Sequence, residues 1–274
     1  MPKVKDRTGE INYNFYGTKM TIINYINKND ITVEFENGYI VKSRYSEFKN
    51  GTIKNPYDKR IFGVGYHGKG DYKVSINQKH TIQYNYWYDM LKRCYDDNYK
   101  QKHPTYKNKT VCKEWHNFQV FAKWFDENYY TINGNERMEL DKDILVRDNA
   151  EYSPETCTFV PKIINTILVK KDANRGRYPI GVTKKGNKFY ARCSKCRDNK
   201  HYRELIGKFD SAEEAFYAYK RIKELYIKEV ADEFKNSIPK KLYEALCNYE
   251  VRITDWSYRQ RETNKYIKII KINT

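Results

Sequence analysis

The stretch that decides the fold is residues 180–234, which read IGVTKKGNKFYARCSKCRDNKHYRELIGKFDSAEEAFYAYKRIKELYIKEVADEF. Short apolar segments separated by polar turns predict three paired strands here, IGVTKKG, KFYARCS and ELIGKFD. Ser211 followed by Glu214 is a capping box, which predicts that a long helix begins at this point. The apolar positions of that helix fall on one face: Ala215, Ala218, Ile222, Leu225 and Val230. We therefore expect a three-stranded sheet with one helix packed against it.

The positive charge of the chain is concentrated around this predicted sheet. The 274 residues include 52 Lys and Arg against 35 Asp and Glu, which gives a net charge of +17. Residues 160–209 hold 14 of the cations and three acids, so they contribute +11. A clustered excess of this kind is typical of a nucleic-acid-binding surface. An acidic protein partner is the weaker interpretation, and lysines that only solvate the surface are the structural alternative.

Composition also restricts the class of protein. No window approaches the roughly 18 to 20 uncharged apolar residues that cross a bilayer, and the start MPKVKDRTGE lacks the apolar core of a secretory signal. Six Cys in this length do not form the disulfide framework of a small secreted scaffold. We expect a soluble cytoplasmic protein with reduced thiols and no membrane partner.

Two further regions precede the predicted sheet. Residues 12–50 alternate apolar and polar positions, and Asn37-Gly38 marks a tight turn, so residues 1–74 are expected to form a small β-barrel-like unit. Helical spacing predicts helices over 84–95 and 115–125. Residues 140–160 then read as strand, turn and strand, and Pro161 can open a short helix, KIINTIL. The fold class predicted for the whole chain is α+β.

Three of these segments carry a resemblance. YWYDMLKRCY, PTYKNKTVCKEWHNFQVFAKW and LDKDILVRDNAEYSPETCTFVP, with Asn165 behind them, resemble the HNH-type endonuclease-like proteins of bacteriophages and prophages. Residues 180–232 resemble the APETALA-type (ethylene-response-factor) DNA-binding domain. The two resemblances cover roughly residues 82–235, and they imply a protein of the host cytoplasm. The domains expected are 1–74, an HNH-like nuclease module at 75–170, an APETALA-type domain at 178–238, and a C-terminal extension at 239–274.

The second resemblance implies a sheet that reads the DNA major groove through cationic and aromatic side chains. It implies contacts from Lys184, Lys188, Tyr190, Arg192 and Arg203. The neighbouring cations Lys185 and Arg197 complete the predicted nucleic-acid-binding set.

The first resemblance implies a ββα-metal fold that holds one Mg²⁺ or Mn²⁺. By position, Asp141 and Asp143 with Asn165 would organise the metal. The chain departs from the family where the catalytic His belongs, because Lys142 occupies that position. A lysine with an ordinary pKa is charged at pH 7 and accepts no proton.

Several alternatives follow from this departure. His103 or His116 could enter the site, the pKa of Lys142 could be lowered, or the metal alone could generate the hydroxide. The module could also have lost cleavage and kept its fold as a DNA-binding platform. For Asp141 and Asp143 the structural alternative is a solvated hairpin edge, and for His116 it is a packed, hydrogen-bonded side chain.

Cys193 and Cys196 have half of a zinc-knuckle spacing, with His201 five residues further on. A structural zinc site needs four ligands, normally from two such pairs, and the chain has no second CxxC. We therefore do not expect bound zinc.

Two functions follow from these observations. The leading hypothesis is a metal-dependent endonuclease of homing type that acts on double-stranded DNA, in which Lys142 or His116 would assist water or hold the phosphate. The rival is a catalytically inactive nucleic-acid-binding protein that acts as a regulator, or as a phage inhibitor of a host nuclease or defence complex. The rival admits a host protein partner, and the sequence predicts no oligomeric state.

Overall fold

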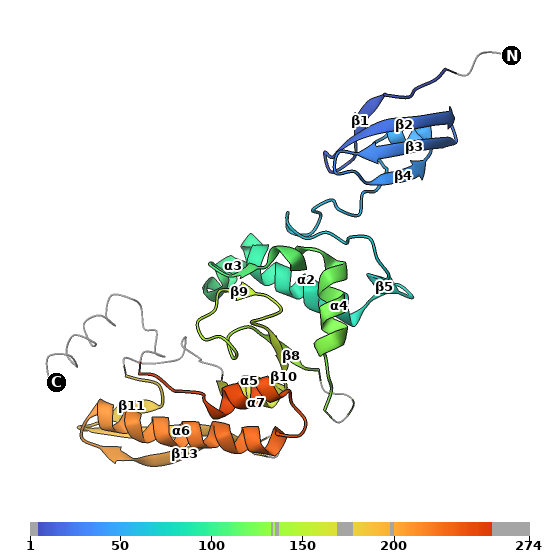
Figure 1. Cartoon of the computed structure of the whole chain (residues 1–274). Coiled ribbons are helices and arrows are strands. Elements are labelled where there is room, and N and C mark those ends of the chain that lie inside the picture. The colour runs from blue at the N-terminus through green and yellow to red at the C-terminus, as the bar shows by residue number, and fades with distance from the viewer. Residues whose placement is uncertain (1–4, 133, 135–136, 169–177, 198–199, 254–274) are drawn as a thin grey trace. The chain divides into compact units, whose positions relative to one another are not determined.

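The computed structural model describes residues 5–132, 134, 137–168, 178–197 and 200–253 (Figure 1). These residues form two compact units. The first holds the described residues up to Asn128 together with 150–154, and the second holds those of 129–149 and those from Glu155 onward. Both units combine helices and strands, so the chain is α+β as predicted. The expected module at 75–170 contributes residues to both units.

The first unit begins with a four-stranded antiparallel sheet in the order β1-β2-β3-β4. Its strands are β1 (Ile11–Tyr13), β2 (Lys19–Asn27), β3 (Asp30–Phe35) and β4 (Ile40–Ser43). Alternate residues of β2 and β3 are buried beneath helix α1 (Tyr45–Lys49). Asn37-Gly38 forms the predicted turn, in which the Gly38 N–H donates to Phe35 O at 2.8 Å.

The expected barrel is wrong in one respect, because this sheet is open. Among the described residues β1 pairs with β2 and β4 with β3, but β1 and β4 do not pair with each other. The two edge strands span only three and four residues. A sheet of so few, short strands does not close into a ring.

Trp87 lies in the helical part of the first unit, where it is fully buried, packs against the Phe118 ring and donates its Nε1–H to Trp115 O at 2.7 Å. The predicted helix at 115–125 begins instead at Phe118, because a 3₁₀ turn ends at His116 and Asn117 is extended. The remaining elements of this unit are β5 (Ser75–Ile76), β6 (Lys79–His80), α2 (Ile82–Tyr95), α3 (Asp97–Lys102), η1 (Pro104–Tyr106), β7 (Thr110–Val111), η2 (Lys113–His116), α4 (Phe118–Asn128) and β9 (Glu151–Tyr152).

The second unit contains an antiparallel strand pair followed by a short helix, and a three-stranded sheet covered by a long helix. The strand pair and its helix are β8 (Glu139–Asp141), β10 (Thr158–Val160) and α5 (Lys162–Leu168). The sheet and its helices are β11 (Val182–Lys185), β12 (Lys188–Arg197), β13 (Lys200–Phe209), α6 (Ala212–Phe234) and α7 (Lys240–Cys247).

The capping box predicted at the start of α6 is confirmed. Ser211 Oγ accepts the Glu214 N–H at 3.1 Å, and Glu214 Oε2 accepts the Ser211 N–H at 3.2 Å. These bonds satisfy two backbone donors that a helix start leaves open. Just before β11, Gly181 has a φ of +80° and lies against the ring of Tyr219 on α6, where a side chain would not fit.

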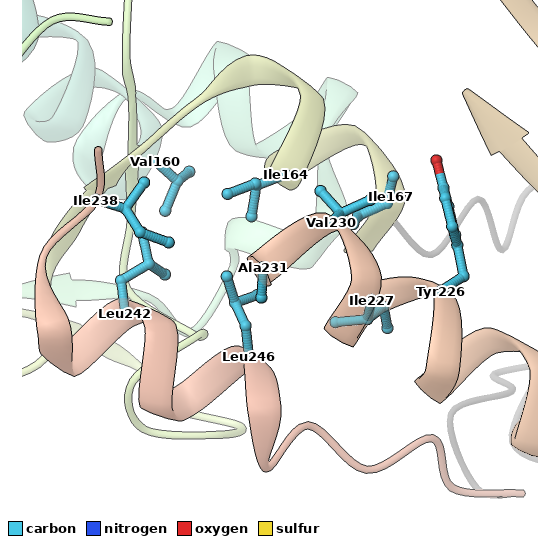
Figure 2. Packing of buried hydrophobic residues seen from close by; sticks show 10 residues of the cluster. All are labelled: Val160, Ile164, Ile167, Tyr226, Ile227, Val230, Ala231, Ile238, Leu242 and Leu246. Carbon is cyan, nitrogen blue, oxygen red and sulfur yellow. The ribbon is translucent and has the colours of Figure 1, made fainter. Parts of the chain in front are cut away.

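Helix α6 contributes to two hydrophobic cores. Its first half packs beneath the sheet, through Ala215, Phe216 and Tyr219. Its second half packs with α5 and α7, as Figure 2 shows. The cluster drawn there consists of Val160, Ile164, Ile167, Tyr226, Ile227, Val230, Ala231, Ile238, Leu242 and Leu246.

One residue predicted for the apolar face of α6 lies elsewhere. Leu225 is 53% exposed, whereas Tyr226 and Ile227 beside it are buried. The helix turns 100° per residue, so a residue adjacent to the buried stripe can face away from it. No described helix is both long enough and apolar enough to cross a membrane.

Candidate nucleic-acid interface

The three-stranded sheet of the second unit has one buried face and one open face. On β12, Ala191 and Cys193 are fully buried and pack in the core beneath the sheet. Successive side chains of a strand point to opposite faces, so Tyr190 and Arg192 lie on the open face. The register extends this face onto β13, because Tyr190 pairs directly with Lys208.

The ring of Tyr190 is flanked by two cations on the open face. Arg192 Cζ lies 5.9 Å from the ring centroid, and Lys208 Nζ lies 5.7 Å from it. Both distances are within the range of cation–π attraction. Arg192 Nε is also enclosed, with no hydrogen-bond partner among the described residues.

Charge on the open face has a single sign. The outward strand positions carry five cations and no Asp or Glu, while Glu204 lies at an inward position and pairs with Lys195 at 2.9 Å. Lys188 also contacts Asp210, just beyond β13. We call the following residues the cationic face: Lys185, Lys188, Tyr190, Arg192, Arg203 and Lys208.

Most of the predicted nucleic-acid contacts lie on the cationic face, with two exceptions. Lys184 lies on the other side of the sheet, since its Nζ is 5.2 Å from the centroid of the Phe189 ring, which packs against the buried core. The side chain of Arg197 lies outside the described residues. Lys208 belongs to the face but was not singled out from sequence. Only the pairing register, which shifts between Ala191 and Arg192, reveals it.

The second predicted site lies at the end of β8. Asp141 Oδ1 accepts the backbone N–H groups of Asp143 at 2.7 Å and Ile144 at 2.8 Å. Burial raises the pKa of Asp141 above its ordinary value, against the effect of these two hydrogen bonds. The carboxylate therefore shapes the turn that follows the strand.

Lys142, at the position where the resemblance implied a catalytic histidine, is only 3% exposed. Its Nζ donates to Asp143 Oδ1 at 2.6 Å, to Asp143 Oδ2 at 2.7 Å and to Asn149 O at 2.9 Å. In return, Asn149 Nδ2 donates to Lys142 O at 3.1 Å. The amine thus closes the loop from 142 to 149 through Asn149, and it also donates to both carboxylate oxygens of Asp143. This geometry does not suit a general base.

Asn165 lies on α5, which begins after Pro161 and contacts β8. It is half-buried, and its N–H donates to Pro161 O at 3.0 Å. Strand, strand and helix therefore follow one another in the order that the resemblance implied, within the second unit.

The two histidines considered for the site belong to the first unit, and each contacts a tyrosine of that unit. His116 Nε2 lies 3.2 Å from Tyr95 OH, which accepts the Val111 N–H at 3.0 Å. Burial lowers the pKa of His116. His103 is exposed and packs on Tyr99, with ring centroids 4.3 Å apart. His116 is therefore a packed, hydrogen-bonded side chain, which is the structural alternative considered from the sequence.

The residues predicted to hold Mg²⁺ do not present a suitable set of donors. Both oxygens of Asp143 bind Lys142, and one oxygen of Asp141 binds two backbone N–H groups. Mg²⁺ requires near-octahedral oxygen ligands at short distance, and here these oxygens would first have to give up their present partners. Within the described residues, no group of three or more His, Cys, Asp or Glu side chains is placed to share a metal ion.

The half-motif for zinc is divided between two environments. Cys193 is fully buried, its thiol contacts Ser194 O at 3.7 Å, and burial raises its pKa. Cys196 is half-buried on the same strand. The thiolate is the form that binds zinc, so burial disfavours Cys193 as a ligand. The side chain of His201 lies outside the described residues.

Comparisons with known proteins identify no relative. No family model matches the chain, and neither a curated protein nor a solved structure matches it.

Proposed function

We propose that this protein binds double-stranded DNA through the cationic face of β11, β12 and β13. The observation that carries the proposal is the gathering of five cations and one ring on the open side of a thin sheet, with no acid among its outward strand positions. A two- or three-stranded β-ribbon is narrow enough to enter the major groove.

The proposal gives different roles to the residues of the cationic face. Lys185, Arg203 and Lys208 would neutralise phosphates, because flexible exposed cations bind backbone anions without reading sequence. Arg192 is held near the ring of Tyr190 and would present its guanidinium to base edges, where arginine pairs with guanine.

We further propose that binding, rather than cleavage, is the activity. The support is Lys142, whose ammonium is committed to Asp143 and Asn149, together with the carboxylate oxygens that are already bonded. The protein would then act as a regulator, or as an inhibitor that occupies DNA or a nuclease complex of a host cell.

Binding is tested by fluorescence anisotropy of a labelled duplex over a range of salt concentrations. We expect log K to fall linearly with log salt, because neutralised phosphates release counterions. The triple variant K185Q/R203Q/K208Q should weaken binding at least about tenfold and flatten this slope. The control K42Q/K54Q/K123Q removes the same charge from exposed sites of the first unit. A flat salt response, or equal losses in both triples, would overturn the proposal.

Metal-dependent cleavage is the second candidate, and the order of β8, β10 and α5 with Asp141, Asp143 and Asn165 favours it. Supercoiled plasmid incubated with the protein and Mg²⁺ or Mn²⁺ separates the two candidates. A binding protein leaves the plasmid intact. Nicking that Asp141→Asn and Asn165→Ala abolish while duplex binding persists would establish the endonuclease instead.

A further inference from the structure

A groove of about 700 Å³ runs between α6 and the segment that follows α7. It lies within the second unit and shares no residue with the cationic face. Volumes of this size are typical of sites that bind ligands.

The groove has apolar walls. Tyr217 and Leu225 line it from α6 and are 55% and 53% exposed, and Tyr249 lines the other side. The two α6 residues are eight positions apart, which is about 12 Å along the helix at 1.5 Å per residue. Large apolar side chains left open in a concave surface mark an interaction site more often than scattered ones do.

The acids that line the groove are already paired. Lys220 Nζ lies 2.7 Å from Glu224 Oε1 and 3.3 Å from Glu250 Oε1, and Glu224 Oε1 accepts the Val251 N–H at 2.8 Å. Arg252 Nε lies 3.5 Å from Glu250 Oε2. This network ties the segment after α7 to α6 and fixes the shape of the groove.

The remaining charge of the groove is positive. Arg221 and Lys228 line it from α6, are exposed, and have no acidic partner among the described residues. Arg147 Cζ lies 5.8 Å from the centroid of the Tyr249 ring, which adds a third cation beside the apolar wall.

We propose that this groove docks a protein segment whose apolar side chains fill the space between Tyr217, Leu225 and Tyr249, and whose flanking Asp and Glu pair with Arg221 and Lys228. Apolar walls and two lining carboxylates suit a peptide better than a nucleic acid, whose phosphates need a surface of cations. Anchors two helical turns apart match the spacing of Tyr217 and Leu225.

The test uses the full chain and a short fluorescein-labelled peptide with two leucines two helical turns apart and glutamates between them. Its counterpart carries lysine in place of each glutamate. We expect the acidic peptide to bind at least about tenfold more tightly than the basic one, and R221E/K228E to remove that difference. Leu225→Ala should weaken binding of the acidic peptide by about fivefold or more.

The matched control is Leu205→Ala, because Leu205 is also 53% exposed but lies on β13. It should leave the binding of the acidic peptide unchanged. Equal losses in Leu205→Ala and Leu225→Ala would show that the peptide is not held at the groove. Equal binding of both peptides would show that Arg221 and Lys228 do not select acidic side chains. Either result would overturn the proposal.

A covalent readout locates the peptide. Cys247 lines the groove and is half-buried, so its Sγ should displace chloride from a chloroacetamide on the acidic peptide, and mass spectrometry should find the thioether there. A thioether at Cys196 on β12 instead would place the peptide at the sheet and refute the proposal. Duplex DNA that needs Leu225 for binding would assign the groove to nucleic acid and refute it as well.

Discussion

Lys142 Nζ contacts both carboxylate oxygens of its sequence neighbour Asp143, at 2.6 and 2.7 Å. The lysine is buried, whereas the Asp143 side chain is 52% exposed. The same amine reaches Asn149 O, seven residues ahead. At the position where the resemblance implies a proton acceptor, this chain therefore has a buried amine that donates to Asp143 and to Asn149 O, and the bond to Asn149 spans the loop.

Lys142→Met should destabilise the second unit. The change leaves the Asn149 carbonyl without this buried donor, and we expect a loss of about 1–3 kcal/mol in the free energy of unfolding. Urea unfolding followed by circular dichroism measures it. Lys188→Met is the control, because both partners of its ion pair with Asp210 are exposed and such pairs contribute about 1 kcal/mol or less. Equal stability of Lys142→Met and the wild type would contradict this role.

Asp141→Asn and Asp141→Ala should differ. An amide oxygen still accepts the N–H groups of Asp143 and Ile144, whereas alanine leaves both donors open. We expect Asp141→Ala to be less stable than Asp141→Asn by about 1–3 kcal/mol at pH 7. Burial raises the pKa of Asp141 in the folded chain, so the protonated carboxyl stabilises the fold. That stabilisation is lost as pH rises above 3.8, and Asp141→Asn should lack this loss. Identical unfolding midpoints of Asp141→Asn and Asp141→Ala would show that the side-chain oxygen of Asp141 does not stabilise the turn.

His116 should make the first unit less stable in mild acid. Burial lowers the pKa of His116 below 6.5, so the unfolded chain binds a proton that the folded chain resists. Stability is therefore full above pH 6.5 and is lost as pH falls below it. His67 shifts in the same direction, also through burial. His116→Gln should reduce the difference between unfolding at pH 7.5 and pH 5.5. If the stability difference between pH 7.5 and pH 5.5 is unchanged in His116→Gln, His116 is not its cause.

Gly181→Ala should destabilise the three-stranded sheet. The residue has a positive φ, and a Cβ there would overlap the Tyr219 ring. Gly186 also has a positive φ, but no atom lies within 4 Å of the place where its Cβ would be. We expect Gly186→Ala to cost about 1 kcal/mol and Gly181→Ala clearly more. Thermal melts of the two variants separate the backbone effect from the steric one, and equal melting temperatures would exclude contact with Tyr219 as a cause.

The sequence predicted β11, β12, β13 and α6 well, because their signals are local, but it did not predict α7. The capping box at Ser211 and the turn-separated strands depend only on neighbouring residues. The faces were harder to predict. A register shift beside Arg192 determines which cations share a face, and a long-range pairing of this kind leaves no local pattern. Leu225 was misplaced because helical spacing alone does not say how wide the buried stripe is.

The candidate site could be predicted only in part, for a similar reason. Tyr190 and Arg192 follow from alternation along one strand. The partner of Lys142 does not, because a bond to a main-chain carbonyl, such as that of Asn149, depends on the path of the loop and on no side-chain identity.

Helix α6 contributes to two hydrophobic cores, and this limits where the chain can be truncated. A fragment cut to residues 178–238 would carry Tyr226, Ile227 and Val230 into water, since α5 and α7, which cover them, lie beyond its ends. A truncated chain made for expression or crystallisation should therefore keep residues 129–253 in one piece.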